Sequence, residues 1–238
     1  MTEWVDVTSS DRLGPRRDLD GALDLSALRR SYEADSLDER TVADTWFEQF
    51  SRWFAAARQD DTVTEPNAMQ LATSDAHGRA SVRTVLAKSV SARGVVFYSN
   101  YRSPKAVDLA QTGWAAAVFA WLTQQRQVRI SGPTAPVDRE ETERYFAQRP
   151  RGSQLGAWAS AQSTVVAGRA ELDAAEVEMA RRFDPDDPVP PPPYWGGYLL
   201  RPVAVEFWAG RANRMHDRLR FRRDDVDSTH WTLERLAP

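Results

Sequence analysis

The chain has 238 residues, of which 42% are hydrophobic and 27% charged, and its formal net charge is −3. This composition predicts a packed core, and the slightly acidic balance disfavours a protein whose whole surface binds nucleic acid. The absence of cysteine excludes disulfides, thiolate metal sites and a cysteine nucleophile. No apolar run approaches the roughly 20 residues of a membrane span, and the N-terminus has no signal-peptide core, so we expect a cytoplasmic protein.

The start of the chain changes from polar to amphipathic. Residues 1–22 are polar and contain Gly and Pro, and we expect a flexible N-terminal arm there, followed by one domain over 23–238. A short helix is predicted over 25–32. Residues 41–58 carry five aromatic residues at helical spacing, which predicts a helix with one apolar face. We interpret these aromatic side chains as core: Trp46, Phe47, Phe50, Trp53 and Phe54.

The hydrophobic period then changes to that of β-strands. Two strands around a Gly-containing turn are predicted over 68–88. The other predicted strands cover 94–100, 114–122, 126–137, 196–202, 204–210, 219–225 and 230–236. Helices are predicted over 138–149, with Asp138 as N-cap, and over 152–160 and 171–183. Mostly antiparallel strands with inserted helices indicate an α+β, mainly antiparallel β domain of barrel type.

A proline-rich segment, 184–193, separates the last four strands from the rest. Its sequence DPDDPVPPPP cannot form regular structure, since proline supplies no backbone donor. A domain linker has this composition, but the 45 residues after position 193 are too few for a comfortable independent core. We therefore expect a loop around one domain, whose C-terminal strands complete an earlier sheet.

Cations on the predicted strand 81–88 point in two directions. Side chains alternate along a strand, so Arg83 and Lys88 lie on opposite faces. A cation in an apolar strand needs an anionic partner, although a salt-bridged surface strand has the same pattern. Gln127 likewise shares one strand face with Arg129. No Gly-rich phosphate loop precedes a helix, so a phosphorylated cofactor would be held by side chains on strands.

The segment 145–163 is dense in side chains that donate hydrogen bonds to phosphate. An ordinary polar loop has a similar composition, and the residue types alone leave both interpretations open. The donors are Tyr145, Arg149, Arg151, Ser153, Gln154, Gln162 and Ser163.

Several motifs occur in a fixed order along the chain, among them RTVLAK, VFYSN, SPKA, RQV, WGGY and the terminal ERLAP. Two longer motifs are the most specific in combination, YFAQRPRGSQLGAWAS and VEFWAGRANRMHDR. Together they resemble the pyridoxine/pyridoxamine 5′-phosphate oxidase family of flavin mononucleotide (FMN) enzymes. The resemblance covers the chain from about Leu28 to Pro238. It implies an FMN-binding split β-barrel with inserted helices.

The resemblance also implies a set of site residues. FMN would be bound by Arg83, Thr84, Val85, Leu86, Lys88, Tyr98, Ser99, Lys105, Gln127, Gln162, Ser163, Trp208 and Arg218. The phosphate of a B6 substrate would be bound by Lys88, Tyr145, Arg149 and Ser153. The substrate ring would be contacted by the catalytic pair Arg214 and His216, and the lid over the substrate would include Arg29 and Tyr32. No metal is implied.

The implied reaction is oxidation of pyridoxamine 5′-phosphate or pyridoxine 5′-phosphate to pyridoxal 5′-phosphate, with dioxygen reduced to hydrogen peroxide. The implied assembly is a homodimer with the flavin between two subunits, without nucleic acid or membrane as partners. Three alternatives stay open. They are an oxidase of the same fold acting on another small molecule, as in phenazine biosynthesis, a non-catalytic flavin- or B6-binding protein, and a nucleic-acid binder using an arginine run.

That arginine run is NRMHDRLRFRR, residues 213–223, and it contains both predicted catalytic residues. If strand alternation extends through it, Arg214, His216 and Arg218 face one cavity. The remaining arginines, Arg220, Arg222 and Arg223, are then a solvated strand paired with Asp224, Asp225 and Asp227.

The chain departs from the family pattern at several places, among them Ala87, the FAW of 119–121 and two places near the expected ligands. Pro104 stands where the family usually has an arginine, and Arg102, two residues earlier, is the nearest substitute. After Tyr32 the usual Lys-Gly-Gly is replaced by Glu-Ala-Asp-Ser, which puts acidic residues near the substrate lid. A missing cation predicts weaker FMN binding, since a charge-assisted hydrogen bond contributes about 1.5–3 kcal/mol.

Overall fold

The computed structural model describes residues 31–238 except 33 and 185. The arm expected over 1–22 and most of the helix expected over 25–32 lie outside the described residues. The two described residues of that helix, Ser31 and Tyr32, are not helical. Arg29 also lies outside, and its contribution to a substrate lid stays a prediction.

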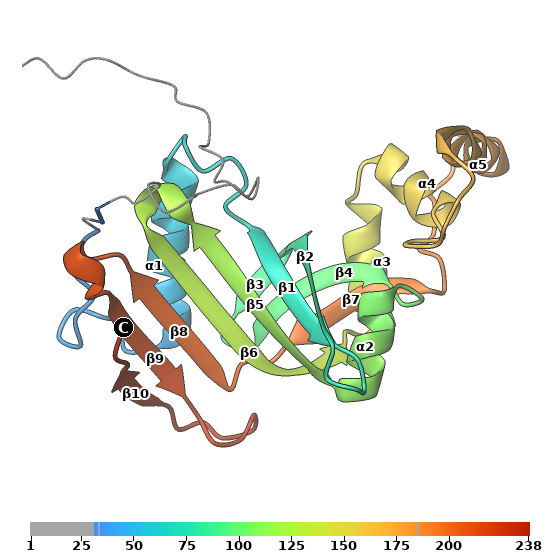
Figure 1. The fold of residues 1–238 in the computed structure, drawn as a ribbon. Helices are drawn as coiled ribbons and strands as arrows, with labels where there is room; N and C mark the ends of the chain where they lie inside the picture. The colour runs from blue at the N-terminus through green and yellow to red at the C-terminus, as the bar shows by residue number, and fades with distance from the viewer. Residues whose placement is uncertain (1–30, 33, 185) are drawn as a thin grey trace, which may run out of the picture.

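In the described part of the chain, ten β-strands form one curled antiparallel sheet, a half-barrel (Figure 1). The strands are β1 (Ala68–Ser74), β2 (Ala80–Leu86), β3 (Ser89–Ser91), β4 (Gly94–Asn100), β5 (Trp114–Trp121), β6 (Arg126–Pro136), β7 (Trp195–Leu200), β8 (Ala204–Ala209), β9 (Asp217–Arg222) and β10 (Thr232–Arg235). Seven of them run in the order β10-β9-β8-β6-β5-β1-β2, while β4 pairs with β3 and β7. The long strand β6 joins the two parts, because residues 126–131 pair with β8 and residues 134–136 with β7.

The strands after the proline-rich segment complete the sheet begun by the earlier ones, as the sequence predicts. β7 pairs with β4, and β8 pairs with β6. The segment itself has no regular structure where it is described. Arg139 holds it by donating to the carbonyls of Pro191 and Pro192. These contacts make it a loop of this fold and not a free linker.

The described part of the chain has five α-helices, of which the first precedes β1 and the other four are inserted between strands. They are α1 (Trp46–Gln59), α2 (Pro104–Thr112), α3 (Arg139–Ala147), α4 (Arg151–Ala159) and α5 (Arg169–Arg182). The Asp138 side chain caps α3, as predicted. Helix α2 has no counterpart among the predicted elements; it starts at Pro104 and ends at Gly113, whose φ of 65° suits glycine. None of the described helices combines the length and the apolar character that a membrane span requires.

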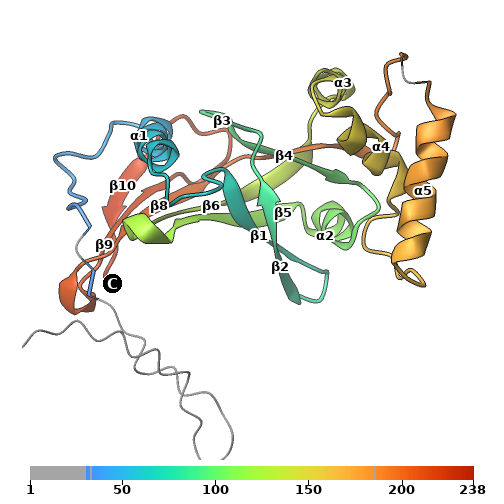
Figure 2. The same ribbon diagram turned by 90° about the horizontal axis from the view of Figure 1, so that it is seen from above.

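Helix α1 covers one face of the sheet, and the main core lies between them (Figures 1 and 2). Its buried face carries Trp46, Phe50 and Trp53, which confirms that these side chains belong to the core. The Phe50 ring packs against Phe119 with centroids 5.0 Å apart, and Trp53 packs against Phe207 at 5.3 Å. Full burial of a large apolar side chain contributes about 1.5–3 kcal/mol, so this layer is a main source of stability.

Two local predictions are wrong. The strand expected over 81–88 ends at Leu86, so Lys88 lies after β2 and not on it. The arginine run does not begin as a strand, because residues 212–214 form a short 3₁₀ turn, η2, and β9 starts only at Asp217. Within η2, Arg214 has a φ of 64°, which is not a strand conformation. Strand alternation therefore cannot place Arg214, His216 and Arg218 on one face.

Candidate active site

A cavity of about 420 Å³, which we call the Lys105 cavity, lies between β2, β4 and the start of α2. Eight of its nine lining residues are residues predicted to bind FMN: Arg83, Thr84, Val85, Tyr98, Ser99, Lys105, Gln162 and Ser163. The ninth is Pro104. Arg102 is not in the lining, and its guanidinium lies 4.5 Å over the ring of Tyr194. Arg102 therefore does not replace the missing cation in this cavity.

Lys105 is the most buried cation of this cavity and is only 9% exposed. Its Nζ donates hydrogen bonds to Gln162 Oε1 at 2.7 Å and to the hydroxyls of Ser99 and Ser103 at 3.1 Å each. Among the described residues, no carboxylate forms an ion pair with it. Burial, together with the charge of Arg83, lowers the pKa of Lys105 to about 8. A buried ammonium group with only neutral partners is suited to bind an anion.

Arg83 reaches the same cavity from β2 and is oriented by a short chain of hydrogen bonds. Its Nη1 donates to the Thr73 hydroxyl at 2.7 Å and to the Leu71 carbonyl at 3.2 Å. The Thr73 hydroxyl in turn donates to the buried carboxylate of Asp108 at 2.6 Å. The Asp108 carboxylate thus sets the direction of the Thr73 hydroxyl, and the other guanidinium nitrogens of Arg83 remain available to a ligand.

A second cavity of about 560 Å³, which we call the Arg149 cavity, adjoins the first. The two cavities share four lining residues: Val85, Tyr98, Ser99 and Gln162. The Arg149 cavity is lined by all four residues predicted to bind the substrate phosphate: Lys88, Tyr145, Arg149 and Ser153. Leu86, another predicted flavin residue, also lines it. The structure thus places the two predicted phosphate sites side by side.

Arg149 has a buried group without a partner. Its Nη1 atom is buried and makes no hydrogen bond within the described structure. The guanidinium lies 4.7 Å over the ring of Trp195 and 5.3 Å from that of Phe146. Burial lowers the pKa of Arg149. Leaving a buried donor unpaired costs about 1–3 kcal/mol, and an anion bound in this cavity removes that cost.

Aromatic rings form a wall of the Arg149 cavity, and one of them, Tyr98, also lines the Lys105 cavity. The rings of Tyr98 and Tyr145 stack with centroids 4.0 Å apart, and Trp195 lies 5.2 Å from Tyr98. Burial raises the pKa of Tyr98 to about 12 and also raises the pKa of Tyr145, so both hydroxyls remain donors at neutral pH. The ring of Tyr98 requires glycine at position 197, because a Cβ there would lie 2.9 Å from its Cε1 atom.

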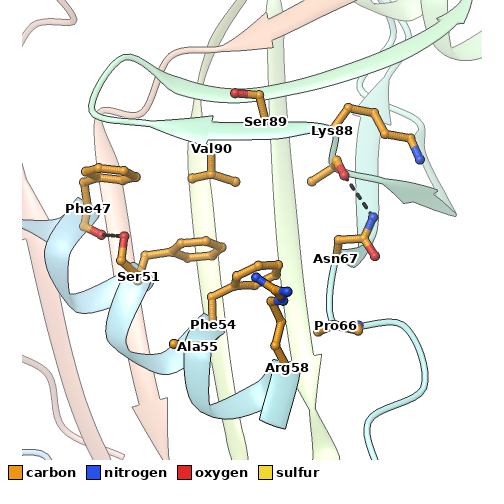
Figure 3. Close-up of a pocket in the computed structure, with 12 residues that line it drawn as sticks. Phe47, Ser51, Phe54, Ala55, Arg58, Pro66, Asn67, Lys88, Ser89 and Val90 are labelled. Atoms are coloured by element: carbon orange, nitrogen blue, oxygen red, sulfur yellow. Dashed lines mark hydrogen bonds between the residues drawn. The ribbon is translucent and has the colours of Figure 1, made fainter. Parts of the chain in front are cut away.

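Lys88 is positioned by hydrogen bonds of the backbone around it. The N–H of Ala87 donates to the carbonyl of Asn67 at 2.9 Å, and Asn67 Nδ2 donates back to the Ala87 carbonyl at 3.0 Å. The N–H of Lys88 donates to the Val96 carbonyl at 2.8 Å. Figure 3 shows this segment beside a separate groove of about 580 Å³ between α1 and β3. The Lys88 ammonium points away from that groove, and Lys88 is the one predicted site residue in its lining.

Three further predicted flavin residues form a row elsewhere on the sheet. The register pairs Gln127 with Trp208 and Trp208 with Arg218, across β6, β8 and β9. All three are partly exposed, whereas the next residues on the same strands that point to the other face, Val128, Phe207 and Leu219, are buried in the core. Arg218 Nε donates to Glu206 at 2.8 Å, and its Nη1 donates to the Ala237 carbonyl at 2.7 Å.

His216 and Tyr32 gather beside this row. The His216 ring centroid lies 4.6 Å from that of Trp208 and 5.6 Å from that of Tyr32. Its Nδ1 accepts a hydrogen bond from the N–H of Arg211 at 3.1 Å, so the neutral ring carries its proton on Nε2. Burial and the nearby charge of Arg214 lower the pKa of His216. His216 is therefore a neutral, oriented donor at pH 7, next to the exposed Arg214.

The rest of the arginine run agrees only in part with the prediction. Arg222 pairs with Asp224 at 2.9 Å, as expected. Arg220 instead pairs with Glu234 at 2.6 Å, because the β9–β10 register places the two residues opposite each other. Arg223 donates to two backbone carbonyls and not to a carboxylate.

The predicted site residues form two groups within one subunit. The first group surrounds the Lys105 and Arg149 cavities, and the second lies on β6, β8, β9 and η2. Helices α2, α3 and α4 lie at one end of the molecule, whereas η2 and the start of β9 lie at the other (Figures 1 and 2). Neither of the two cavities is lined by a residue of the second group. One described subunit therefore does not bring all the predicted site residues together.

Two protein-family models match this chain. The model described as pyridoxamine 5′-phosphate oxidase matches residues 55–180, and the model described as pyridoxine 5′-phosphate oxidase C-terminal dimerisation region matches residues 195–238. The chain belongs to the pyridoxine/pyridoxamine 5′-phosphate oxidase family. The second match supports a homodimer and covers β7 to β10, which carry part of the second group of residues.

Relatives named pyridoxine/pyridoxamine 5′-phosphate oxidase align over most of the chain. The protein from Saccharopolyspora erythraea is 54% identical over 214 residues, which cover 90% of this chain and 95% of the relative. The protein from Burkholderia vietnamiensis is 50% identical over 214 residues, or 90% and 99% of the two chains. These relatives support an oxidoreductase.

Solved structures of this family confirm the split-barrel fold. PhzG from Burkholderia lata 383, determined with tetrahydrophenazine-1-carboxylic acid, is 32% identical with a TM-score of 0.77, covering 86% of this chain and 99% of its own. A pyridoxamine 5′-phosphate oxidase-related, FMN binding protein from Nostoc punctiforme is 19% identical with a TM-score of 0.65, over 83% and 100% of the two chains. At that identity the second likeness concerns the fold alone.

The donors of this family member fit a bound flavin phosphate. The Lys105 cavity combines two cations with hydroxyl and amide groups and contains no carboxylate in its lining. The adjoining Arg149 cavity adds a buried donor without a partner. No cluster of histidine, aspartate and glutamate among the described residues could hold a metal ion.

The residues that sequence reasoning missed have partners far away in the sequence. Asp108 supports Arg83 through Thr73, which lies 35 positions before it. Glu206 contacts both Arg218 and Arg129, and the latter is 77 positions away. The one signal in the sequence was a charged residue within an otherwise apolar segment, such as the glutamate of AVEFWA.

Proposed function

We propose that this protein is an FMN-dependent oxidase of pyridoxamine 5′-phosphate and pyridoxine 5′-phosphate. The observation that carries the proposal is a pair of adjoining cavities, each lined by a cation that is at least partly buried and has no ion-pair partner in the described structure. Lys105 is that cation in one cavity and Arg149 in the other. Two neighbouring anion sites suit a phosphorylated cofactor and a phosphorylated substrate bound side by side.

The Lys105 cavity is the proposed site of the FMN phosphate. Lys105 and Arg83 supply the positive charge, and neutral donors complete the set: Thr84, Ser99, Gln162 and Ser163. Arg83 and Lys88 line different cavities, although Lys88 lies beyond β2 and not on its second face. Tyr98 lies in the wall between the two cavities.

The Arg149 cavity is the proposed site of the substrate phosphate. Arg149 offers a planar pair of N–H groups, and Lys88 adds a flexible point charge. Tyr145 and Ser153 add neutral hydrogen bonds. These contacts exist in both the ground state and the transition state, so they hold the substrate without accelerating the chemical step.

Bound FMN supplies hydride acceptance and reoxidation by dioxygen. The overall reaction converts pyridoxamine 5′-phosphate, dioxygen and water into pyridoxal 5′-phosphate, ammonia and hydrogen peroxide. His216 and Arg214 orient the substrate ring and hold protons near it. The tautomer of His216, with its proton on Nε2, makes that atom the donor.

We propose further that each active site is shared by two subunits of a homodimer. Support comes from the distance between the two groups of site residues within one subunit and from the matched dimerisation region. A two-fold axis brings the second group of one subunit to the cavities of the other and creates two equivalent sites. We also take residues 23–238 as one domain, because the strands after residue 193 complete the sheet.

The function is tested with protein stripped of flavin. We expect tight FMN binding, hydrogen peroxide release on adding pyridoxamine 5′-phosphate, and poor turnover of unphosphorylated pyridoxamine. FMN binding without peroxide release supports a non-catalytic binding protein. Oxidation of tetrahydrophenazine-1-carboxylic acid that does not depend on Arg149 supports an oxidase with a PhzG-like substrate. Failure to bind FMN refutes the proposal.

Shared sites are tested by combining two impaired variants, R149A and H216A, at a substrate concentration far below the KM of R149A. In a heterodimer, one site carries both substitutions and the other carries neither. Co-expression should therefore restore one intact site per heterodimer, measured as peroxide release after purification with two different tags. If each site lies within one subunit, the heterodimer stays as impaired as the two variants.

A further inference from the structure

Glu206 is a buried carboxylate on the face of the sheet that points away from the main core. Along β8, Val205 and Phe207 point into the core, so Glu206 points the other way, as does Trp208. Glu206 is nevertheless only 5% exposed. A buried carboxylate is stable only when charged or polar partners surround it, so its contacts are decisive.

Glu206 divides its two oxygens between two arginines. Oε1 accepts from Nε of Arg218 at 2.8 Å, and Oε2 accepts from Nη2 of Arg129 at 2.6 Å. Arg218 is held at a second point, because its Nη1 donates to the Ala237 carbonyl at 2.7 Å. With Nε and Nη1 engaged, the Nη2 atom of Arg218 has no partner among the described residues. The orientation of the Arg218 guanidinium is therefore fixed, while its Nη2 side stays free to bind a ligand.

The free Nη2 side of Arg218 lies in the row that also contains Gln127 and Trp208, where a flavin is expected. We propose that Glu206 is a positioning residue: by holding Nε of Arg218, it aims the remaining N–H groups of that arginine at the bound flavin. This inference rests on the proposed function. An arginine aligned in advance loses less conformational entropy when it binds its ligand, so the pairing strengthens flavin binding.

The charge balance agrees with this role. One carboxylate faces two guanidinium groups, so the cluster of Glu206, Arg129 and Arg218 keeps a net positive charge. A buried ion pair contributes little net stability, because desolvation offsets much of the attraction. The competing interpretation is that Glu206 only ties β6 to β9 and has no effect specific to the flavin.

The same face of the sheet offers a matched control. Glu234 on β10 also pairs with two arginines, Arg220 at 2.6 Å and Arg222 at 3.6 Å. Neither of these arginines is a predicted flavin residue. E234Q therefore removes a similar double ion pair without touching Arg218.

The experiment measures the FMN dissociation constant and the visible absorption spectrum of bound FMN for five proteins. They are the wild type, E206Q, R218A, the double variant E206Q/R218A, and E234Q. We expect E206Q to weaken FMN binding about tenfold, as loss of a charge-assisted contact does, and to shift the flavin absorption band. E234Q should change the dissociation constant less than about twofold. In the R218A background, E206Q should cause no further loss.

Each other outcome has a defined meaning. Wild-type affinity and spectrum in E206Q overturn the inference but leave the proposed function intact. An equal loss from E206Q with and without Arg218 also overturns it, because the effect then does not pass through that arginine. If E206Q does not fold, E206D keeps the charge with a shorter reach, and unchanged FMN binding in E206D overturns the inference. A wild-type protein that binds no FMN refutes the proposed function and this inference with it.

Discussion

Replacing Arg149 by methionine should stabilise the flavin-free protein while impairing its proposed substrate binding. Within the described part of the chain, the buried Nη1 of Arg149 has no hydrogen-bond partner, and such a donor costs about 1–3 kcal/mol. Against this stands the loss of contacts with the rings of Trp195 and Phe146, which contribute about 0.5–2 kcal/mol. Methionine recovers part of that through sulfur–aromatic contact, about 0.3–1.5 kcal/mol. We expect a net gain of about 1 kcal/mol in the free energy of unfolding.

The effect on the substrate should have the opposite sign. A charge-assisted hydrogen bond to phosphate contributes about 1.5–3 kcal/mol, so R149M should raise KM for pyridoxamine 5′-phosphate about 10- to 150-fold. Because Arg149 would stabilise the bound substrate and the transition state equally, kcat should fall less than kcat/KM. FMN affinity should stay unchanged, since Arg149 does not line the Lys105 cavity.

The assays are urea unfolding of the flavin-free protein and steady-state peroxide release. R151M is the matched control, because Arg151 is a neighbouring arginine that donates to the backbone carbonyls of Phe183, Asp184 and Asp187. R151M should lower stability and leave KM unchanged. The reasoning is refuted if R149M lowers stability and leaves KM at the wild-type value, or if it loses FMN and retains substrate affinity.

Three other tests address the remaining groups. The pKa of Lys105 is about 8 in the folded protein, against an ordinary value of 10.5. Between these two pH values the unfolded chain binds more protons at this lysine than the folded protein does. The free energy of unfolding of the flavin-free protein should therefore increase as the pH rises from 8 to 10.5. Over the same pH range, FMN should bind more weakly because Lys105 loses its charge. If K105M shows the same pH dependence of stability and of FMN affinity as the wild type, the prediction is wrong. H216A should bind FMN normally but reduce it more slowly in anaerobic stopped flow, with exposed H230A as control; equal rates would sink the assignment. P104R should tighten FMN binding about tenfold by restoring a cation, and equal or weaker binding would show that another group fills that role.

The sequence by itself determined the elements whose residues carry local or periodic signals. The aromatic spacing from Trp46 to Phe54 fixed an amphipathic helix, because one face of α1 must be buried. Alternation along β6 correctly placed Gln127 and Arg129 opposite the buried Val128. The ordered motifs determined the family, since their combination constrains many positions at once.

Only the tertiary structure decided which charged groups meet. Asp108 supports Arg83 through Thr73, and Glu206 joins Arg129 to Arg218, because sheet register and helix packing bring residues from distant segments together. No periodic pattern in the sequence predicts the contacts of Asp108 or Glu206.

The sequence pattern also did not predict where β2 ends or that a 3₁₀ turn precedes β9. Lys88 lies after the end of β2, and η2 precedes β9 within the arginine run, so strand alternation does not apply to Arg214 and His216. Local propensity is a weak determinant at such points, because the positive φ of Arg214 is tolerated only when the surrounding fold fixes it. The separation of the site into two groups is likewise a property of the folded sheet, because the strand order places β2 at one edge and β8 and β9 toward the other.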